Sequence, residues 1–219
     1  MKSAGMHVLK YTGVFILSYL IGSAATAVWA GRIFHKTDVR KHGSGNAGAT
    51  NVIRVLGWKT GIPVLLIDIF KGYLAASLPV LFKLAGPGTA QLINLQILTG
   101  LLAVCGHIFP VYAGFRGGKG VAAIFGVLLA IHPLLTLSCI GVFLLVFLAT
   151  GYVSLGSLSA GVAFPVFLFL FFDTPSVIFK VFSVVIAIML IITHRKNISR
   201  LLKGEESKLL RKNTGTGKN

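Results

Sequence analysis

The stretch "TGVFILSYLIGSAATAVWA", residues 12–30, decides which kind of fold this chain adopts. It approaches the roughly 20 apolar residues that an α-helix needs to cross the hydrocarbon core of a bilayer. Similar runs recur as far as Thr193, and the chain is 55% hydrophobic and 12% charged. Because backbone polar groups must be paired inside lipid, these runs predict an all-α polytopic integral membrane protein. A transmembrane barrel would show short alternating segments instead.

About seven segments are expected to cross the membrane. The first run is too long for a signal peptide and opens a multispan pattern, so we expect it to be retained. The fourth segment is short and ends before a proline, which disfavours helix in the preceding residue, so the number of crossings stays open there. Residues 52–60 form either a separate helix or the start of the second span. The expected spans are 12–31, 61–82, 92–111, 120–132, 134–150, 153–172 and 176–194.

The charge distribution predicts the topology. The chain carries 21 Lys and Arg residues against 5 Asp and Glu residues. Six of these cations lie in residues 32–59 and eight in residues 195–218, but only Lys2 and Lys10 precede the first span. By the positive-inside rule, the N-terminus lies outside and the C-terminus in the cytoplasm. Topology accounts for the positive charge, so we expect no nucleic-acid partner.

The first polar cluster is "RKHGSGNAGATNVIR", residues 40–54. Its glycines allow the backbone N–H groups to turn into a concave anion site, and its short polar side chains add neutral donors. Arg54 offers a planar fork suited to phosphate. The alternative is a flexible loop without a ligand. The residues expected to contact an anion are Gly43, Ser44, Gly45, Asn46, Gly48, Thr50, Asn51 and Arg54.

The second cluster is "DIFKG", residues 68–72, inside an apolar span. Asp68 and Lys71 are three residues apart and share a helix face. Charges inside a span are costly unless they are paired and face protein or water. We interpret them as a structural ion pair, with Lys71 as a direct substrate ligand as the alternative.

The third cluster is "GHIFPVYAGFRGGKGVA", residues 106–122. Glycines surround Lys119 just before an expected helix, which suits a phosphate on exposed backbone amides. Ala113 stands where a Walker A loop requires its first glycine, so nucleotide hydrolysis is disfavoured. His107, in an apolar helix, is either a structural residue or a ligand. The residues expected to contact phosphate here are His107, Gly117, Gly118, Lys119 and Gly120.

The fourth cluster is "THRKN", residues 193–197, at the end of the last expected span. His194 and Asn197 lie one helical turn apart, so both can point into one polar pocket. The alternative is an ordinary basic cap, because helix C-termini favour cations. The predicted topology places all four clusters at the cytoplasmic face, where they would form a pocket for more than one phosphate-like anion.

In this order on a multispan chain, "GSGNAGATNVIR", "DIFKG", "GHIFPVYAGFRGGKGVA" and "THRKNI" resemble the bacterial acyl-phosphate:glycerol-3-phosphate acyltransferases of the PlsY type. The resemblance covers about residues 10–203. It implies transfer of a fatty acyl group from acyl phosphate to the 1-hydroxyl of sn-glycerol 3-phosphate, giving lysophosphatidic acid and phosphate. This reaction is the first acylation of bacterial phospholipid synthesis. Matching positions expected to act on the substrates are Ser44, Arg54, Lys119, His194 and Asn197.

The resemblance also implies a setting for the reaction. We expect a multi-pass protein of the bacterial inner membrane with its active site facing the cytoplasm, and no cofactor. Residues 1–203 would form one transmembrane acyltransferase domain, and residues 204–219 a basic, disordered tail. The enzyme that produces the acyl phosphate would be a functional partner, and the bilayer itself would hold the acyl chain.

The residues leave two mechanisms open. None of the six histidines is followed five residues later by an acid, so a His-x4-Asp catalytic pair is absent from the sequence. His194 could be a general base, since an unperturbed histidine has a pKa near 6.5. Alternatively, a substrate phosphate oxygen takes the hydroxyl proton while Lys119 and backbone amides stabilise the developing charge. We favour the second mechanism.

Two other classes of protein compete with this interpretation. A transporter could also contain polar, glycine-broken helices, but its site would lie near the midplane and internal repeats would be common. A CDP-alcohol phosphotransferase would need several aspartates for divalent metal, and this chain has five acids in all. We therefore expect no catalytic metal.

Overall fold

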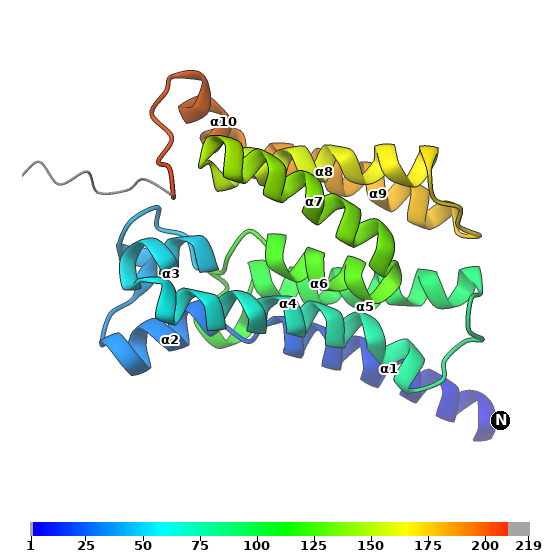
Figure 1. The fold of residues 1–219 in the computed structure, drawn as a ribbon. Coiled ribbons are helices and arrows are strands. Elements are labelled where there is room, and N and C mark those ends of the chain that lie inside the picture. Colours follow the sequence, from blue (N-terminus) through cyan, green and yellow to red (C-terminus); the bar gives the residue numbers. More distant parts are fainter. Residues whose placement is uncertain (1, 210–219) are drawn as a thin grey trace, which may run out of the picture.

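The computed structural model describes residues 2–209, without the side chains of residues 2–4, 6 and 7. Two short 3-10 turns, η1 (Val39–Lys41) and η2 (Val111–Ala113), accompany the helices (Figure 1). In the described range there is no β-strand, which confirms the prediction of an all-α fold. The helices are α1 (Lys2–Gly22), α2 (Thr26–His35), α3 (Ala49–Leu56), α4 (Trp58–Leu81), α5 (Ala90–Ile108), α6 (Val121–Ile131), α7 (Pro133–Thr150), α8 (Val153–Leu170), α9 (Val177–Thr193) and α10 (Arg195–Leu202).

Between four and six spans of residues 2–209 are long and apolar enough to cross a membrane. Helices α4, α5, α7 and α8 qualify singly, and the bent pairs α1–α2 and α9–α10 bring the number to six. The expected crossing at 120–132 corresponds to α6, which has only 11 residues. A helix of that length extends about 17 Å, against a hydrocarbon core of about 30 Å. The multispan fold is confirmed, but α6 is too short to cross alone.

The first expected span is broken rather than continuous. Residues 23–25 separate α1 from α2, and the two helices meet at 43°. Next to the break, Gly22 and Gly106 bring α1 and α5 together so closely that a Cβ on either glycine would meet backbone atoms of the other helix. Small residues allow this close approach, which is a common way for helices to pack in membranes.

Residues 52–60 also belong to two different helices. Helix α3 ends at Leu56, and α4 begins immediately after Gly57. Gly57 has φ +85° and ψ 171°, a conformation essentially restricted to glycine. The first five residues of the segment thus complete a short separate helix that precedes the second span.

Helix α6 is packed against α4 through glycines. A Cβ on Gly72 of α4 would meet the backbone of Ala123, and a Cβ on Gly126 of α6 would meet the backbone of Ile69. Ala76 on α4 and Val127 on α6 are buried in the same contact. This close packing fixes α6, and with it the third polar cluster, which lies directly before its first residue.

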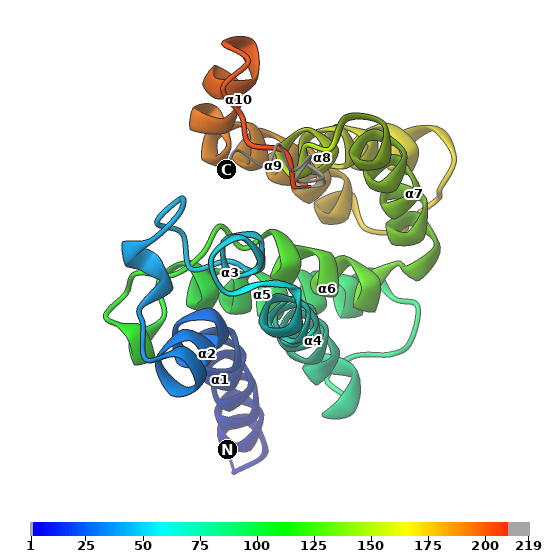
Figure 2. The same ribbon diagram turned by 60° about the vertical axis from the view of Figure 1, so that its left-hand side comes forward.

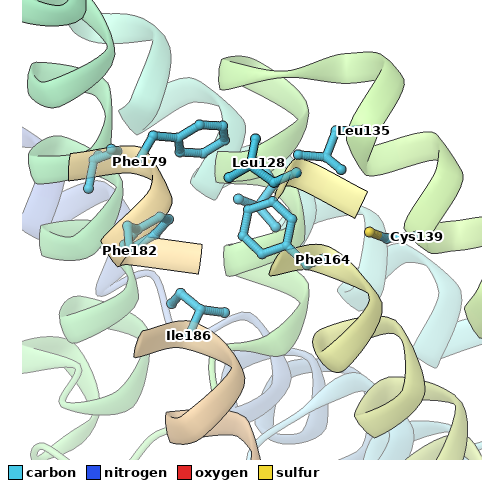
Figure 3. Packing of buried hydrophobic residues seen from close by; sticks show 9 residues of the cluster. Leu128, Leu135, Cys139, Phe164, Phe179, Phe182 and Ile186 are labelled. Atoms are coloured by element: carbon cyan, nitrogen blue, oxygen red, sulfur yellow. The ribbon is translucent and has the colours of Figure 1, made fainter. Parts of the chain in front are cut away.

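Helices α7, α8 and α9 form a second group that joins the first through one hydrophobic cluster. Figure 3 shows side chains of α6, α7, α8 and α9 packed against one another. Large apolar side chains on the outside, such as Leu145 and Leu170, are exposed, as expected for a lipid-facing surface. The cluster consists of Ile97, Leu128, Leu135, Cys139, Phe164, Leu168, Phe179, Phe182 and Ile186.

The first, third and fourth polar clusters lie toward one end of the helices, and the second lies halfway along α4. Helices α2, α3 and α10 occupy this end in Figure 1, whereas the α4–α5 and α8–α9 connections lie at the opposite end. In Figure 2, α10 lies across from α3 and the loop that precedes it. The clustering supports the expectation of one shared polar site. The side of the membrane that it faces stays a prediction.

The described part of the C-terminal segment differs from the disorder that we expected after residue 203. Glu206 is buried, and the Leu209 N–H donates to the Gly151 carbonyl at 3.0 Å. Residues 204–209 therefore fold back toward the start of α8. Residues 210–219, the rest of the expected tail, lie outside the described residues, and the domain boundary stays a prediction.

We expect Gly126→Ala to destabilise the fold because its Cβ would meet the Ile69 carbonyl across the α4–α6 contact. Overpacking of this kind costs about 1–3 kcal/mol. Thermal unfolding in detergent should show a lower Tm, while Gly141→Ala, whose Cβ would meet nothing within 4 Å, should unfold like the wild type. Equal Tm values for the two variants would contradict the close packing of α6.

Candidate active site

The first polar cluster is shaped by Asn51, which lies in the first turn of α3 and is buried. Its Oδ1 accepts the Ser44 N–H at 2.8 Å. Its Nδ2 donates to the carbonyls of Val39 and His42 at 2.9 and 3.1 Å. We expected Asn51 to contact an anion, but its amide is committed to the protein and holds residues 39–44 in a tight loop.

The same loop requires glycine at two positions. Gly43 and Gly45 have φ values of +60° and +71°, in the left-handed region that favours glycine. A Cβ on Gly43 would also meet the Asn51 side chain. Gly48 is extended and caps the N-terminus of α3. The glycine pattern was correctly interpreted as a turning backbone.

The side-chain functional groups of Ser44 and Arg54 are not used in hydrogen bonds within the described part of the chain. Both residues are exposed, and within residues 2–209 neither the Ser44 hydroxyl nor the Arg54 guanidinium has a hydrogen-bond partner. Thr50 is half-buried, and the Asn46 side-chain oxygen is buried without a partner in the described part of the chain. Among the described residues, no hydrogen bond joins these groups to the fourth cluster.

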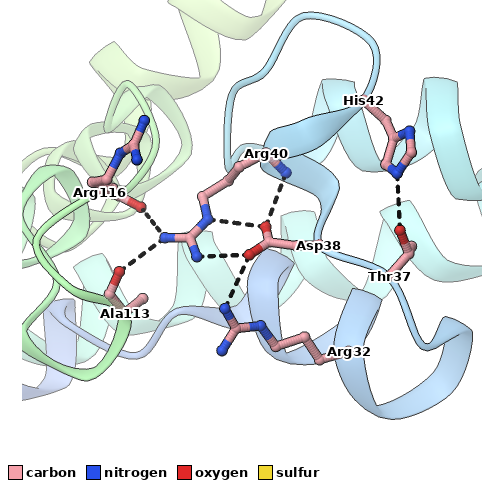
Figure 4. A network of polar contacts seen from close by, with 7 residues as sticks. All are labelled: Arg32, Thr37, Asp38, Arg40, His42, Ala113 and Arg116. Carbon is pink, nitrogen blue, oxygen red and sulfur yellow. Dashed lines mark hydrogen bonds and ion pairs between the residues drawn. The ribbon is translucent and has the colours of Figure 1, made fainter.

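Arg40 links this loop to the third cluster (Figure 4). Its guanidinium donates to both carboxylate oxygens of Asp38 and to the carbonyls of Ala113 and Arg116. Hydrogen bonds from Arg40, assisted by Arg32 and opposed by partial burial, hold the pKa of Asp38 well below its usual range. The sequence contained a signal for this pair in the Asp-x-Arg spacing, which we had not singled out.

The second cluster supports the structural interpretation of the ion pair. Asp68 and Lys71 are 1% and 4% exposed, and Lys71 Nζ lies 2.8 Å from Asp68 Oδ1. Lys71 also donates to the Ala24 carbonyl at 2.8 Å, and the Thr26 hydroxyl donates to Asp68 Oδ1 at 2.6 Å. Ala24 lies in the break between α1 and α2, and Thr26 is the first residue of α2. The buried pair therefore ties α4 to the unwound backbone at this break.

His107 connects the ion pair to the third cluster. Its Nδ1 lies 3.7 Å from Asp68 Oδ1, and its Nε2 faces Gly118, where a Cβ would meet it. The Gly117 and Gly118 N–H groups donate to the carbonyls of Ile108 and His107 at 3.0 and 3.2 Å. We expected these two amides to be exposed for phosphate, but they are paired with the end of α5.

Gly118 is also the point where the first and third clusters meet. A Cβ at this position would lie 3.0 Å from the Ala47 carbonyl. Residues around it line a cavity of about 10 Å³, enough for one water molecule. Gly120 has φ +79° and caps the N-terminus of α6. The glycines here allow close packing and a left-handed turn.

The third and fourth clusters are joined by a hydrogen bond between Lys119 and Asn197. Lys119 Nζ donates to Asn197 Oδ1 at 2.5 Å, and Asn197 Nδ2 donates to Glu206 Oε1 at 2.8 Å. Glu206 also accepts from Arg200 Nε at 2.6 Å and from the Ser154 hydroxyl at 2.9 Å. Lys119 and Asn197 were predicted to share a site, and the structure brings them together.

Glu206 is a site residue that the sequence analysis missed. Burial opposes its charged form, but hydrogen bonds from Asn197, Arg200 and Ser154 outweigh burial and hold its pKa below the usual range. The charged carboxylate fixes the orientation of the Asn197 amide, so that the Asn197 oxygen faces Lys119. The available signal was an acidic pair in an otherwise basic segment.

His194 lies at the 59° bend between α9 and α10 and is buried. Its Nδ1 is 2.9 Å from the Leu190 carbonyl. Because a carbonyl only accepts, Nδ1 carries the proton, and Nε2 of the neutral ring keeps its lone pair. The second ring nitrogen can therefore accept a proton or a hydrogen bond.

A cavity of about 290 Å³ lies beside Lys119, between the end of α5 and the α9–α10 bend. Its lining combines cationic and apolar side chains, which suits an amphiphilic anion. Within residues 2–209, no group of three or more His, Cys, Asp or Glu side chains is placed to hold a metal ion. The lining residues are Ile108, Gly118, Lys119, Ile192, Thr193, Arg195 and Lys196.

These features define a class of protein: an integral membrane protein with cationic side chains beside a partly apolar cavity at one end of its helices. The family model described as glycerol-3-phosphate acyltransferase matches residues 12–204. The chain belongs to the glycerol-3-phosphate acyltransferase family and is an acyltransferase. The resemblance stated from the sequence motifs is thereby confirmed, and the transporter and phosphotransferase interpretations are set aside.

Relatives cover almost the whole chain. The glycerol-3-phosphate acyltransferase of Chlorobaculum parvum is 41% identical over 225 residues, which are 92% of this chain and 97% of that protein. The one of Chlorobium luteolum is 40% identical over 223 residues, 90% of this chain and 95% of that protein.

Solved structures of PlsY, an integral membrane glycerol 3-phosphate acyltransferase, have the same fold. The glycerol 3-phosphate form gives a TM-score of 0.78 at 38% identity, covering 91% of this chain and 95% of that one. The lysophosphatidic acid form gives a TM-score of 0.75 at 38% identity, covering 90% and 94%.

Deprotonation of Lys119 should limit activity at alkaline pH. Burial and the nearby Arg200 lower the pKa of Lys119 from its ordinary value. The attraction of Glu206 opposes this shift but does not cancel it. If charged Lys119 binds substrate, kcat/KM should decline at a pH below that expected for an ordinary lysine, about 10.4. In Lys119→Arg the side chain stays charged, so the decline should move to higher pH. An unchanged profile, or the same displacement in the exposed control Lys59→Arg, would contradict this assignment.

Proposed function

We propose that this acyltransferase uses acyl phosphate as its donor and acylates the 1-hydroxyl of glycerol 3-phosphate. The products would be lysophosphatidic acid and inorganic phosphate. The observation that carries the proposal is the amphiphilic cavity beside Lys119, which offers cations next to apolar side chains. The substrate and product forms named for the solved relatives support the acceptor and the product.

The two substrates would use different walls of the site. Ser44 and Arg54, whose functional groups have no partner within the described chain, suit one phosphate. Lys119 and Asn197 would contact the other phosphate across the cavity beside α9. His194 completes this wall, because its Nε2 is left available by the Nδ1 hydrogen bond to Leu190.

The transfer would be direct. The acceptor hydroxyl oxygen attacks the carbonyl carbon of the acyl phosphate, and the bond from this carbon to the phosphate oxygen breaks. The phosphate leaves with the electron pair, and a substrate phosphate oxygen takes the hydroxyl proton. Lys119 would stabilise the negative charge that develops on the transferring group. Since acyl phosphate has a good leaving group, positioning both substrates supplies much of the rate.

His194 as a general base is the competing mechanism. The two roles predict different kinetics for His194→Ala: loss confined to the acceptor KM indicates binding, whereas a collapsed kcat with a normal KM indicates a base. We expect the first pattern. The neutral tautomer fixed by Leu190 would let Nε2 accept a hydrogen bond from the acceptor while the substrate phosphate takes the proton.

The setting of the reaction follows from the substrates. The active site would face the cytoplasm from the inner membrane, in agreement with the cations that gather at this end of the chain. A lipid-tailed product would remain in the bilayer, and an enzyme that makes acyl phosphate would act immediately before. Without a catalytic metal, activity would survive EDTA.

The donor can be tested with purified protein in detergent. Palmitoyl phosphate and glycerol 3-phosphate should yield lysophosphatidate and phosphate in equal amounts, whereas palmitoyl-CoA should yield neither. The proposal would be wrong if palmitoyl-CoA served equally well, or if acyl phosphates of several chain lengths gave no product. Labelled palmitoyl phosphate without acceptor should leave no stable label on the protein. A labelled protein would overturn direct transfer.

Ser44→Ala and Arg54→Ala should each reduce kcat/KM on the order of a hundredfold, the usual loss when one charge-stabilising donor is removed. Both residues are exposed, so the variants should fold and unfold thermally like the wild type. Lys59→Ala removes an exposed cation from the neighbouring helix start and should remain active. Full activity in both site variants would reduce residues 42–51 to a connecting loop.

A further inference from the structure

We propose that Arg40 is a positioning residue that locks residues 113–116 and thereby places Lys119 in the active site. The proposal rests on the proposed function only in that Lys119 contacts a substrate. Its direct consequence, the order of residues 113–118, is a property of the free enzyme and needs no substrate to be measured.

Arg40 uses its whole guanidinium to join two segments. Nε and Nη2 donate to the two Asp38 carboxylate oxygens at 2.9 and 2.7 Å. Nη1 donates to the carbonyls of Ala113 and Arg116 at 2.8 and 3.1 Å (Figure 4). One edge of the planar guanidinium thus binds the Asp38 carboxylate, and the remaining nitrogen, Nη1, binds the loop at residues 113–116. A lysine ammonium, which is a compact point charge, cannot reproduce this arrangement.

The segment that Arg40 holds is strained. Gly114 and Phe115 have φ values of +66° and +58°, so two left-handed residues lie between the two carbonyls that Arg40 binds. Glycine adopts this conformation readily, but a phenylalanine in it is unfavourable. The Phe115 side chain is 56% exposed, so protein packing does little to offset the strain. The backbone contacts of the turn must hold it, and those from Arg40 are charge-assisted.

The strained turn leads directly into the catalytic lysine. Gly117 and Gly118 follow it and pair with the end of α5. Lys119 then reaches Asn197 on α10. If the turn relaxed, the register of Gly117 and Gly118 against α5 would be lost, and Lys119 would no longer be directed at Asn197. Arg40 therefore acts on the reaction through Lys119, without contact to a substrate.

Arg32 provides a matched control. It also donates to Asp38, at 3.0 Å, but its side chain is 58% exposed and it makes no hydrogen bond to residues 113–116 among the described residues. Removing Arg32 weakens the same carboxylate pair and leaves the far loop held. Any difference between the two variants therefore reports the contacts with Ala113 and Arg116.

The experiment compares Arg40→Ala, Arg40→Lys and Arg32→Ala in the full chain in detergent. Without substrates, hydrogen exchange of the Gly117 and Gly118 amides should accelerate at least about tenfold in Arg40→Ala, as expected for the loss of charge-assisted hydrogen bonds. With substrates, kcat/KM should fall by at least about the same factor. Arg40→Lys should recover little of either loss. Arg32→Ala should stay within about twofold of the wild type in both measurements.

A further variant tests the strain itself. Phe115→Gly removes the unfavourable left-handed phenylalanine, so in the Arg40→Ala background it should slow the exchange of Gly117 and Gly118 again. Should Arg40→Ala fail to fold, Arg40→Lys with and without Phe115→Gly supports the same comparison. Unchanged exchange in the Arg40 variants, or equal effects of Arg40→Ala and Arg32→Ala, would overturn the proposal. A different result would separate the two proposals. If exchange accelerated in the Arg40 variants but even the wild type transferred no acyl group from palmitoyl phosphate, only the proposed donor would be contradicted.

Discussion

A buried ion pair inside a membrane-spanning helix is the interaction on which the site depends. Asp68 and Lys71 together would be costly in a low-dielectric environment if either lacked its partner. Their second contacts explain why the pair lies where it does. Lys71 satisfies the Ala24 carbonyl, and Asp68 accepts from Thr26, so both charges bind the chain where α1 stops and α2 begins. Unwound backbone at membrane depth is tolerated only when protein groups satisfy it, and this pair supplies them.

The break has a geometric result for the rest of the site. Because α2 departs from α1 at an angle, the segment that follows α2 returns over the end of α5, where Ala47 meets Gly118. His107 lies between Asp68 and Gly118 and so connects the ion pair to the loop before α6. The first and third clusters are therefore held together by buried polar groups, with glycines at the points of closest approach.

Most of the fold was predictable, because apolar runs of sufficient length report membrane spans directly. Four of the expected spans correspond to single long helices. The break at residues 23–25 could not be predicted from the run around it, since every residue there is compatible with a helix and the group that binds its free Ala24 carbonyl, Lys71, is far away in the sequence. Asn51 shows the same limit: its type suits a ligand, and only the fold turns it inward. Glu206 was missed because a charged residue in a basic tail carries no periodicity that distinguishes a buried partner from a solvated one.

The length of α6 has a consequence for where the chemistry occurs. Helix α6 ends and α7 begins at the same corner, His132, and α6 is shorter by seven residues, 11 against 18. At 1.5 Å per residue, the loop that carries Lys119 therefore stops about 10 Å short of the level that α7 reaches. Acyl transfer at that depth would leave the fatty tail among hydrocarbon, which matters because moving each methylene into water costs about 0.8 kcal/mol. In the proposed reaction, the small polar acceptor would then move to the level of the acyl chain, and the lipid would not have to leave the hydrocarbon.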